Sequence, residues 1–322
     1  MLTALLILIV GVLCLFAGGH LLVRGASQLA LRLELSPLFI GLTVVAFGTS
    51  LPELMVTFLA DLRGAPEIAV GNVVGSNIAN LGLVLGTAAL VAPLSLHSTK
   101  IVRDLAISIA ATVIVALLAL NGHLGRAEGV ALLLGLTAYV LWSYRGATTT
   151  AEISLETMLS VIPALYALVR QPGVVRSTLM VTVGLAVLLA GANWAIDGAV
   201  EVADLAGLRT EVVGLTIVAV GTSLPELTTS VVAAWKRESD ISIGNILGSN
   251  VFNLFGILGV SATTKPLTIA PHILSYDLPI VVGFSLLCLP MVMTGRRISR
   301  GEGLLLLVCY IAYCGWLYVL RG

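Results

Sequence analysis

The stretch VVAFGTSLPELMVT at residues 44–57 returns as IVAVGTSLPELTTS at residues 217–230, with nine of fourteen positions identical. A second pair, IAVGNVVGSNIANLGLVLG (68–86) and ISIGNILGSNVFNLFGILG (241–259), has ten of nineteen positions identical. Both pairs are separated by the same 173 residues, so the chain is a duplication of one unit. Each copy places a proline, two hydroxyls and a carboxylate within six residues of an apolar segment, and this needs an explanation.

The composition is that of a membrane protein. Of the 322 residues, 58% are hydrophobic and 11% are charged, whereas a soluble domain has about a quarter charged residues. A net charge of zero gives no indication of nucleic acid binding, and no obligate protein partner is evident. The four cysteines lie in apolar segments and are expected to be small buried side chains rather than disulfides. The bilayer is therefore the expected surroundings of the chain.

Ten apolar runs of about 20 residues are each long enough to cross a ~30 Å hydrocarbon core. They cover residues 2–22, 37–60, 68–92, 101–121, 126–145, 177–196, 211–235, 241–262, 273–294 and 302–320. The first is read as a span rather than a cleaved signal, because no basic region precedes it and a second apolar segment follows. The sequence thus predicts an all-α polytopic membrane protein with ten transmembrane helices.

Residues 146–176 are expected to form a linker between two halves. The apolar piece at Met158–Val169 is too short to span and suggests an interfacial helix. Twelve of the 17 Lys and Arg residues fall on the side of this linker. The positive-inside rule therefore predicts a cytoplasmic linker and both termini outside, in a multi-pass protein of the cell membrane.

The duplication and the span count together predict the architecture. Each half, residues 1–145 and residues 177–322, holds five predicted spans. An odd number of spans makes the second half enter the membrane from the opposite side. The halves are therefore expected to be inverted repeats, related by a pseudo-twofold axis in the membrane plane.

The prolines of GTSLPE are expected to interrupt their helices. Pro52 and Pro225 have no amide hydrogen, and each ring clashes with the carbonyl four residues back, near Gly48 and Gly221. A carbonyl freed within hydrocarbon is costly unless another group satisfies it. A structural kink with back-bonded hydroxyls is one explanation, and a ligand site is the other.

The carboxylates favour the ligand site. A charge at mid-membrane costs at least ~2.5–3.5 kcal/mol, so Glu53 and Glu226 each require a partner. No Lys or Arg lies between Arg32 and Arg63, or between Arg209 and Lys236, and the helices of the second block are equally bare. The glutamates must then be protonated or neutralised by cations from solution.

The second block supplies neutral oxygens beside these acids. Ser76 and Asn80 are four residues apart, as are Ser249 and Asn253, so each pair shares a helical face. The block also contains small-residue patterns typical of helix packing, namely Gly71/Gly75 and Gly244/Gly248. Asparagine can join helices in the same way, but beside a carboxylate we favour a role as ligand. All the expected ligands are oxygen atoms, which suits Ca²⁺ or Na⁺ and not zinc or copper.

These two blocks resemble the α-repeats of the cation/calcium exchanger superfamily, and are most similar to those of prokaryotic sodium/calcium exchangers. The resemblance covers nearly the whole chain and implies a secondary antiporter, not an enzyme, with Ca²⁺ and Na⁺ as substrates and no resident cofactor. It implies Ca²⁺ binding by Glu53 and Glu226, with Asn80 and Asn253 in the remaining central positions. It further implies Na⁺ sites formed by Thr49, Ser50, Ser76 and the carbonyl of Ala46, and by Thr222, Ser223, Ser249 and the carbonyl of Ala219.

Two departures within the resemblance bear on coupling. Some relatives, including potassium-dependent ones, carry Asp at the position of Asn253, so potassium dependence is disfavoured here. Proton-coupled relatives usually carry an acid after the "GN" of the second block, where this chain has Val73 and Ile246. Exchange of H⁺ for Ca²⁺, or for another divalent cation, remains the alternative to exchange of Na⁺.

Charge counting suggests why such a site would exchange ions. Two carboxylates are neutralised by one divalent cation or by two monovalent ones, and binding both loads together is unfavourable in low dielectric. The first and sixth spans are expected to be long and to slide against the other helices to alternate access. Asp104 and Asp277 fall at span ends, where we expect structural capping roles.

A cation channel and an intramembrane serine protease are the alternatives from other classes of function. A cation channel would conduct one ion without a counter-ion and usually has an oligomeric pore. An intramembrane serine protease would need a His or Lys to activate Ser50 or Ser223, and neither span contains one.

Overall fold

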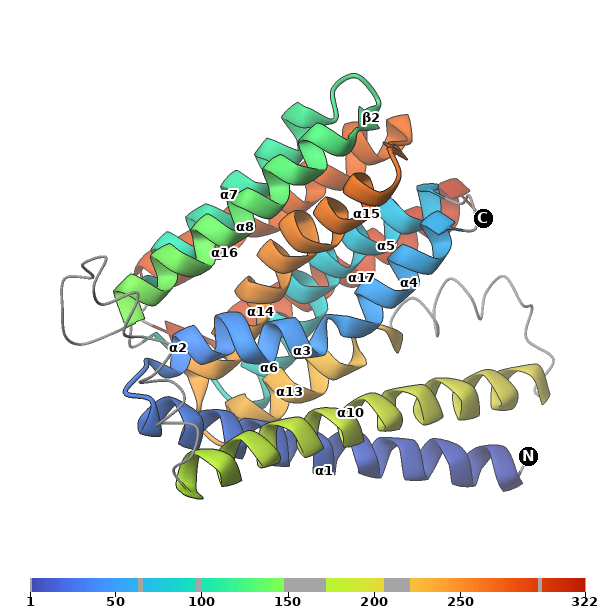
Figure 1. The fold of residues 1–322 in the computed structure, drawn as a ribbon. Coiled ribbons are helices and arrows are strands. Elements are labelled where there is room, and N and C mark those ends of the chain that lie inside the picture. The colour runs from blue at the N-terminus through green and yellow to red at the C-terminus, as the bar shows by residue number, and fades with distance from the viewer. Residues whose placement is uncertain are drawn as a thin grey trace.

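The computed structural model describes residues 2–62, 66–96, 100–147, 172–205, 221–294 and 297–321, and it is almost entirely helical (Figure 1). Four short segments, marked η, are π-helices, in which the backbone hydrogen bonds skip one residue more than in an α-helix. The first half runs α1 (Leu2–Arg32), α2 (Pro37–Ile40), η1 (Gly41–Val45), α3 (Ala46–Thr49), α4 (Leu51–Leu62), α5 (Pro66–Ala79), η2 (Asn80–Val84), α6 (Leu85–Val91), β1 (Leu94–Ser95), α7 (Lys100–Leu118), β2 (His123–Leu124) and α8 (Arg126–Ala147).

The second half repeats this order. It runs α10 (Pro172–Leu205), α13 (Leu224–Trp235), α14 (Ser239–Val251), η4 (Phe252–Ile257), α15 (Leu258–Thr264), β3 (Leu267–Thr268), η5 (Ile273–Asp277), α16 (Leu278–Thr294), β4 (Arg297–Ile298) and α17 (Arg300–Arg321). The helix predicted around Met158–Val169 lies outside the described residues. Both α8 and α10 extend slightly into the range 146–176 that the sequence assigned to the linker.

Among the described residues, eight helices are long and apolar enough to cross a membrane, and the bent pair Pro37–Thr49 and Leu51–Leu62 makes a ninth span. These agree in position with nine of the predicted spans. The predicted span 211–235 is described only from residue 221 onward, so a total of ten remains a prediction. The chain is a multi-pass helical membrane protein.

The first and sixth spans are longer than their apolar runs suggested. α1 continues ten residues beyond the predicted end at residue 22, and α10 exceeds the predicted span 177–196 at both ends. In α1 the buried face continues through Leu29 and Ala30, so packing rather than local hydropathy sets its length. The two helices lie side by side along one edge of the molecule, next to a tilted bundle formed by the other helices (Figure 1).

Glycines at heptad spacing bring α1 and α10 into backbone contact. A Cβ atom at Gly18 would lie 2.8 Å from the Gly184 carbonyl oxygen, and one at Gly191 would lie 2.6 Å from the Leu15 nitrogen. The same close approach recurs along the antiparallel pair at Gly11, Gly25, Gly184 and Gly198. Adding 173 to the positions in α1 gives those in α10, so both repeats contribute the same surface to this contact.

The centre of the bundle is formed by the two spans that carry the second repeated block. The span Pro66–Val91 is 72% buried and Ser239–Thr264 is 89% buried, far more than the outer spans. Packing by glycine is confirmed in the second of them, where a Cβ at Gly244 would lie 2.6 Å from the Leu38 carbonyl oxygen. No described atom lies within 4 Å of a Cβ at Gly71 or Gly75, and residues 206–220, which include the counterpart of the Leu38 segment, are not described.

Short strands join the halves in a reciprocal manner. β1 pairs antiparallel with β4, and β2 pairs antiparallel with β3. β1 corresponds to β3 at an offset of 173 residues, and β2 corresponds to β4 at an offset of 174. Each strand thus pairs with a strand from the other half, as a two-fold relation requires.

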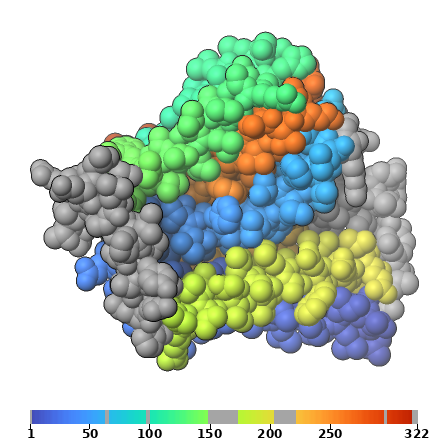
Figure 2. All heavy atoms as spheres, in the orientation of Figure 1, coloured from blue at the N-terminus to red at the C-terminus, as the bar shows by residue number. Residues whose placement is uncertain are grey.

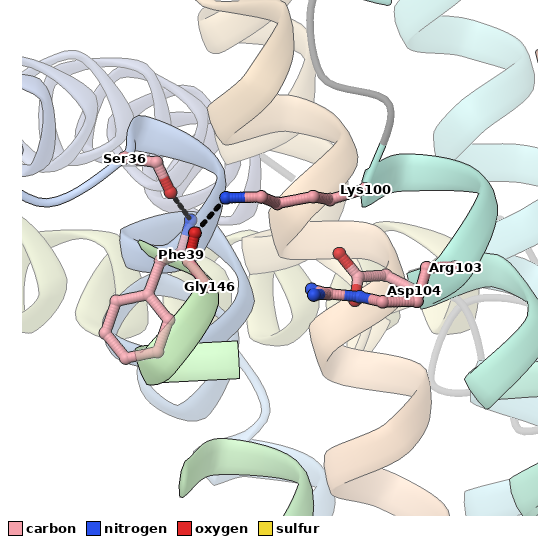
Figure 3. A network of polar contacts seen from close by, with 6 residues as sticks. All are labelled: Ser36, Phe39, Lys100, Arg103, Asp104 and Gly146. Carbon is pink, nitrogen blue, oxygen red and sulfur yellow. Dashed lines mark hydrogen bonds and ion pairs between the residues drawn. The ribbon is translucent and has the colours of Figure 1, made fainter. Parts of the chain in front are cut away.

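Asp104 has a structural role other than the expected helix cap, and Asp277 makes a side-chain contact to another helix. Asp104, which is fully buried, forms an ion pair with Arg103 at 2.8 Å (Figure 3). The Arg103 guanidinium also lies over the Trp142 ring. Lys100, one turn away, donates a hydrogen bond to the carbonyl of Gly146 (Figure 3). Asp277 accepts a hydrogen bond from the Tyr313 hydroxyl at 3.2 Å. For Asp104 the contact found is thus a side chain and not a helix N–H group.

Candidate cation site

The GTSLPE motif ends one helix and begins another. Ser50 has φ −83° and ψ 8° between α3 and α4, and the two helices are bent by 44° at this point. Ser223 adopts the matching conformation, φ −88° and ψ 6°, before α13. Each proline then lies at the second position of the new helix, where its missing N–H costs nothing. The predicted interruption is confirmed, and it places both glutamates in the first turn of a helix, where the dipole favours negative charge.

The two glutamates are buried and cross-linked between the repeats. Glu53 is 1% exposed and Glu226 is fully buried. The Ser50 hydroxyl donates to Glu226 Oε1 at 3.0 Å, and the Ser223 hydroxyl lies 3.5 Å from Glu53 Oε1. Because these contacts connect residues of opposite halves, the two carboxylates belong to one centre.

Each glutamate keeps one oxygen without a hydrogen-bond partner among the described residues, Glu53 Oε2 and Glu226 Oε2. Among the described residues, no Lys or Arg forms an ion pair with Glu53 or Glu226, so no described basic side chain neutralises either carboxylate. In the same part of the chain, no three His, Cys, Asp or Glu side chains converge. The negative charge of the centre therefore comes from two glutamates and requires cations or protons.

Asparagines from both repeats close the centre. Asn80 Nδ2 donates to Asn250 Oδ1 at 3.0 Å, and Asn253 Nδ2 donates to Asn77 Oδ1 at 3.0 Å. The amide oxygens of Asn80 and Asn253 have no partner among the described residues. Both side chains are fully or almost fully buried. The amide nitrogens join the helices, as the packing interpretation expects, while the amide oxygens are left without a described partner, so the role as ligand stays a prediction.

The expected hydroxyl ligands are all buried, whereas the expected backbone carbonyl of Ala46 already has hydrogen-bond partners. Thr49, Ser50, Ser76, Thr222, Ser223 and Ser249 are all buried, and Ser249 Oγ has no partner in the described part of the chain. The carbonyl of Ala46 already accepts from the Ser50 amide at 3.0 Å and from the Thr49 hydroxyl at 3.3 Å. The Thr49 hydroxyl has one proton and also lies 3.0 Å from Asn245 Oδ1, and donation to that oxygen leaves the Ala46 carbonyl a free lone pair. The carbonyl of Ala219 lies outside the described residues.

Two positioning residues were missed from the sequence. Asn72 Nδ2 donates to the Glu53 carbonyl at 3.3 Å and to the Thr57 hydroxyl at 3.0 Å. Asn245 makes the same pair of contacts, to the Glu226 carbonyl at 3.4 Å and the Ser230 hydroxyl at 3.0 Å. Each asparagine therefore fixes the helix that carries a glutamate. Their identity in both copies of the second block is the signal that could have revealed them.

Local π-helices also shape the centre. Asn80 is the first residue of η2, and Asn253 is the second residue of η4, at equivalent positions of the two repeats. Such wide turns occur often at functional sites because they displace side chains and backbone carbonyls from regular α-helical positions. Hydropathy periodicity does not distinguish them from an α-helix.

Several known proteins that are similar to this chain are named as sodium/calcium exchangers or antiporters. The family model described as "Sodium/calcium exchanger protein" matches residues 3–145 and 176–319. The chain is 37% identical to "Putative antiporter CaxA" of Alkalimonas amylolytica, with 97% of this chain and 98% of the relative covered. It is 33% identical to "Sodium/calcium exchanger MaX1" of Methanosarcina acetivorans, with 96% of each covered. The fold is similar to a solved structure of the sodium-calcium exchanger NCX_Mj soaked with Na⁺ and Ca²⁺, with a TM-score of 0.85, 29% identity and both chains fully covered.

Proposed function

Because this chain belongs to the sodium/calcium exchanger family, we propose that it exchanges Na⁺ for Ca²⁺ at the centre formed by Glu53 and Glu226. Membership makes it a membrane transporter of the cation exchanger class and not an enzyme. The observation that carries the proposal is the pair of buried carboxylates that share hydrogen bonds across the repeats and keep one unpartnered oxygen each.

Charge balance supports exchange over simple binding. One Ca²⁺ neutralises both carboxylates, and so do two Na⁺ ions. Both loads together would leave excess positive charge in a low dielectric, where repulsion between ions is strong. An empty centre would keep two buried negative charges, which penalises movement across the membrane without a load. Mutual exclusion of the two ions is therefore the physical basis of coupling.

The ligands divide between the two ions in this proposal. Ca²⁺ is held by Glu53 and Glu226, and the amide oxygens of Asn80 and Asn253 complete the central positions. The Na⁺ sites use the hydroxyls and carbonyls that the family resemblance implies, which are Thr49, Ser50, Ser76 and Ala46 in one repeat and Thr222, Ser223, Ser249 and Ala219 in the other. Hard oxygen ligands with a total charge of −2 suit both ions.

Alternating access requires the centre to open to each face of the membrane in turn, and two inverted repeats provide matching structures for the two openings. We propose ten spans in two inverted five-helix repeats, residues 1–145 and 177–322, joined by a cytoplasmic linker at 146–176 with both termini outside the cell membrane. Reciprocal contacts between the repeats, in the serine–glutamate pairs and the strand pairs, support this arrangement. The long pair α1 and α10, attached along one edge of the bundle (Figure 2), slides against it to expose the centre to each face in turn.

A proton is the competing coupling ion, since the unpartnered glutamate oxygens accept a proton as readily as a cation. The test is ⁴⁵Ca²⁺ uptake into proteoliposomes with Na⁺, K⁺ and H⁺ gradients imposed one at a time. We expect an outward Na⁺ gradient to drive uptake and a pH gradient at equal Na⁺ to drive none. Uptake that follows only the pH gradient would replace the proposal with H⁺/Ca²⁺ antiport. Flux without any counter-ion gradient dependence would indicate a channel.

A further inference from the structure

Helix α4 carries a second acid that the central site does not use. Asp61 lies eight residues after Glu53, with Thr57 midway, and the spacing of four residues puts all three on one face. They are the buried residues of α4, and Asp61 is 1% exposed. At 1.5 Å of rise per residue, Asp61 stands about 12 Å along the helix from Glu53.

The carboxylate of Asp61 has no hydrogen-bond partner among the described residues. Neither Oδ1 nor Oδ2 makes a hydrogen bond to any described residue, although both are buried. A buried carboxylate is costly unless it is hydrogen-bonded, paired with a charge or protonated. Asp104 differs from it, since one oxygen of Asp104 pairs with Arg103 and only the other lacks a described partner.

A lysine lies close to Asp61 without pairing with its carboxylate. Lys265 Nζ donates to the backbone carbonyl of Asp61 at 3.3 Å, and no ion pair joins the two side chains. The ammonium group is thus near enough to compete electrostatically with a cation at Asp61. Because Lys265 donates to the backbone carbonyl, both carboxylate oxygens of Asp61 remain available to bind a cation.

Polar groups connect Asp61 to the centre along the contact of α4 with α5. The Thr57 hydroxyl lies between the two acids and accepts from Asn72 Nδ2, which also donates to the Glu53 carbonyl. A hydroxyl and an amide thus lie on the same helix contact between the two acids.

The other repeat lacks this feature. The counterparts of Glu53, Thr57 and Asp61 are Glu226, Ser230 and Ala234, so the polar face of α13 ends one turn earlier. α13 packs extensively against α6 and α1, while α4 meets α15, the counterpart of α6, over a much smaller surface. The additional acid therefore belongs to one face of the molecule, the one that carries Lys265.

We propose that Asp61 forms a peripheral cation site on the route between the glutamate centre and the face of the molecule that carries Lys265. This inference rests on the proposed function and deepens it. The ligand is a hard cation of the transported kind, Ca²⁺ or Na⁺, held transiently by the carboxylate. A negative charge on the route raises the local concentration of cations and their rate of arrival at the centre. The effect is confined to one face of the membrane, which the proposed orientation makes the outer face.

The test is an isosteric variant, Asp61→Asn, measured on the two faces separately in right-side-out and everted membrane vesicles. We expect the KM for Ca²⁺ and for Na⁺ to rise about 3- to 10-fold on the Lys265 face, with the maximal rate and the KM on the opposite face unchanged. Lys265→Gln should lower the KM on the same face, because it removes a competing positive charge. The matched variant Ala234→Asp should lower the KM on the opposite face only.

Two other outcomes would overturn the proposal. An unchanged KM on both faces would mean that Asp61 is a protonated structural acid. Equal changes on both faces, or a fall in maximal rate alone, would indicate general damage to the fold and would overturn the proposal. If H⁺ proves to be the counter-ion, the proposed function fails, yet the one-sided change in the KM for Ca²⁺ still tests Asp61.

Discussion

The two repeats of this molecule agree at the centre and differ toward the ends of their helices. At the centre, contacts come in reciprocal pairs, such as Ser50 with Glu226 and Ser223 with Glu53. Toward the ends some positions differ between the repeats, since Asp61 corresponds to Ala234. Shared residues therefore define what is bound, and residues found in one repeat only are where the two faces of the membrane can be treated differently.

The first such difference concerns the two acids at equivalent positions of α7 and η5. Asp104 is neutralised by Arg103, whereas Asp277 lies in a π-helix and accepts from Tyr313. Breaking a buried ion pair leaves an uncompensated charge, but Arg103 is 25% exposed, so solvent screens part of the effect. We expect Arg103→Met to lower the free energy of unfolding by roughly 2–3 kcal/mol.

The matched variant at the other end is Tyr313→Phe. It removes one hydrogen bond to Asp277 and should cost about 1 kcal/mol. Thermal unfolding in detergent, followed by circular dichroism, would compare the two variants. Equal destabilisation would show that the repeats support these acids in the same way and would remove this contrast.

For the glycine contact between α1 and α10 we expect equal effects of matched substitutions, because both repeats contribute the same glycines to it. A Cβ at Gly18 or at Gly191 would lie well inside contact distance of the facing backbone. Gly18→Ala and Gly191→Ala should each cost about 1–3 kcal/mol through overpacking. Gly283→Ala is the control, since nothing lies within 4 Å of a Cβ there. A stable Gly18→Ala variant with an unstable Gly191→Ala variant would break the symmetry of this contact.

The smallest expected effect comes from a link that only one repeat possesses. The Ser27 hydroxyl of α1 donates to Glu238 Oε1 at 2.9 Å, and this joins the sliding pair to the start of α14. The corresponding positions are Val200 and Ala65, which cannot form such a bond. Ser27→Ala should remove about 1 kcal/mol from one conformation and shift the ratio of KM values on the two faces about 5-fold.

Val200→Ala is the control for this link, because it shortens a side chain at the equivalent position without removing a hydrogen bond. It should leave the ratio of KM values unchanged. If Ser27→Ala behaves like Val200→Ala, the link does not distinguish the two conformations.

The centre of the molecule was largely predictable from the sequence, because a duplicated motif shows which residues both halves require. Glu53, Glu226 and the serines beside them were identified in this way, as was the interruption of the helix at each proline. The π-helices η2 and η4 were not, since their hydropathy pattern is that of an α-helix. The lengths of α1 and α10 were underestimated, because contact between two helices, and not the apolar run of either, determines where they end.

Asp61 illustrates a different limit of sequence reasoning. A lone acid near the end of an apolar span is expected to reach water. Only the structure shows that this carboxylate is buried and without a described partner, on the same face as Glu53. Repeat comparison favours what is shared, and so it passes over a residue that one half has and the other lacks.

The central claim is that Glu53 and Glu226, one from each repeat, form a single cation site. Its most direct test is equilibrium Ca²⁺ binding, measured by calorimetry on the purified protein and on Glu53→Gln and Glu226→Gln, with and without Na⁺. The account predicts one Ca²⁺ per chain, displaced by Na⁺, and a Kd weakened about 100-fold or more in each single variant. Ca²⁺ binding of unchanged affinity in either variant would contradict it.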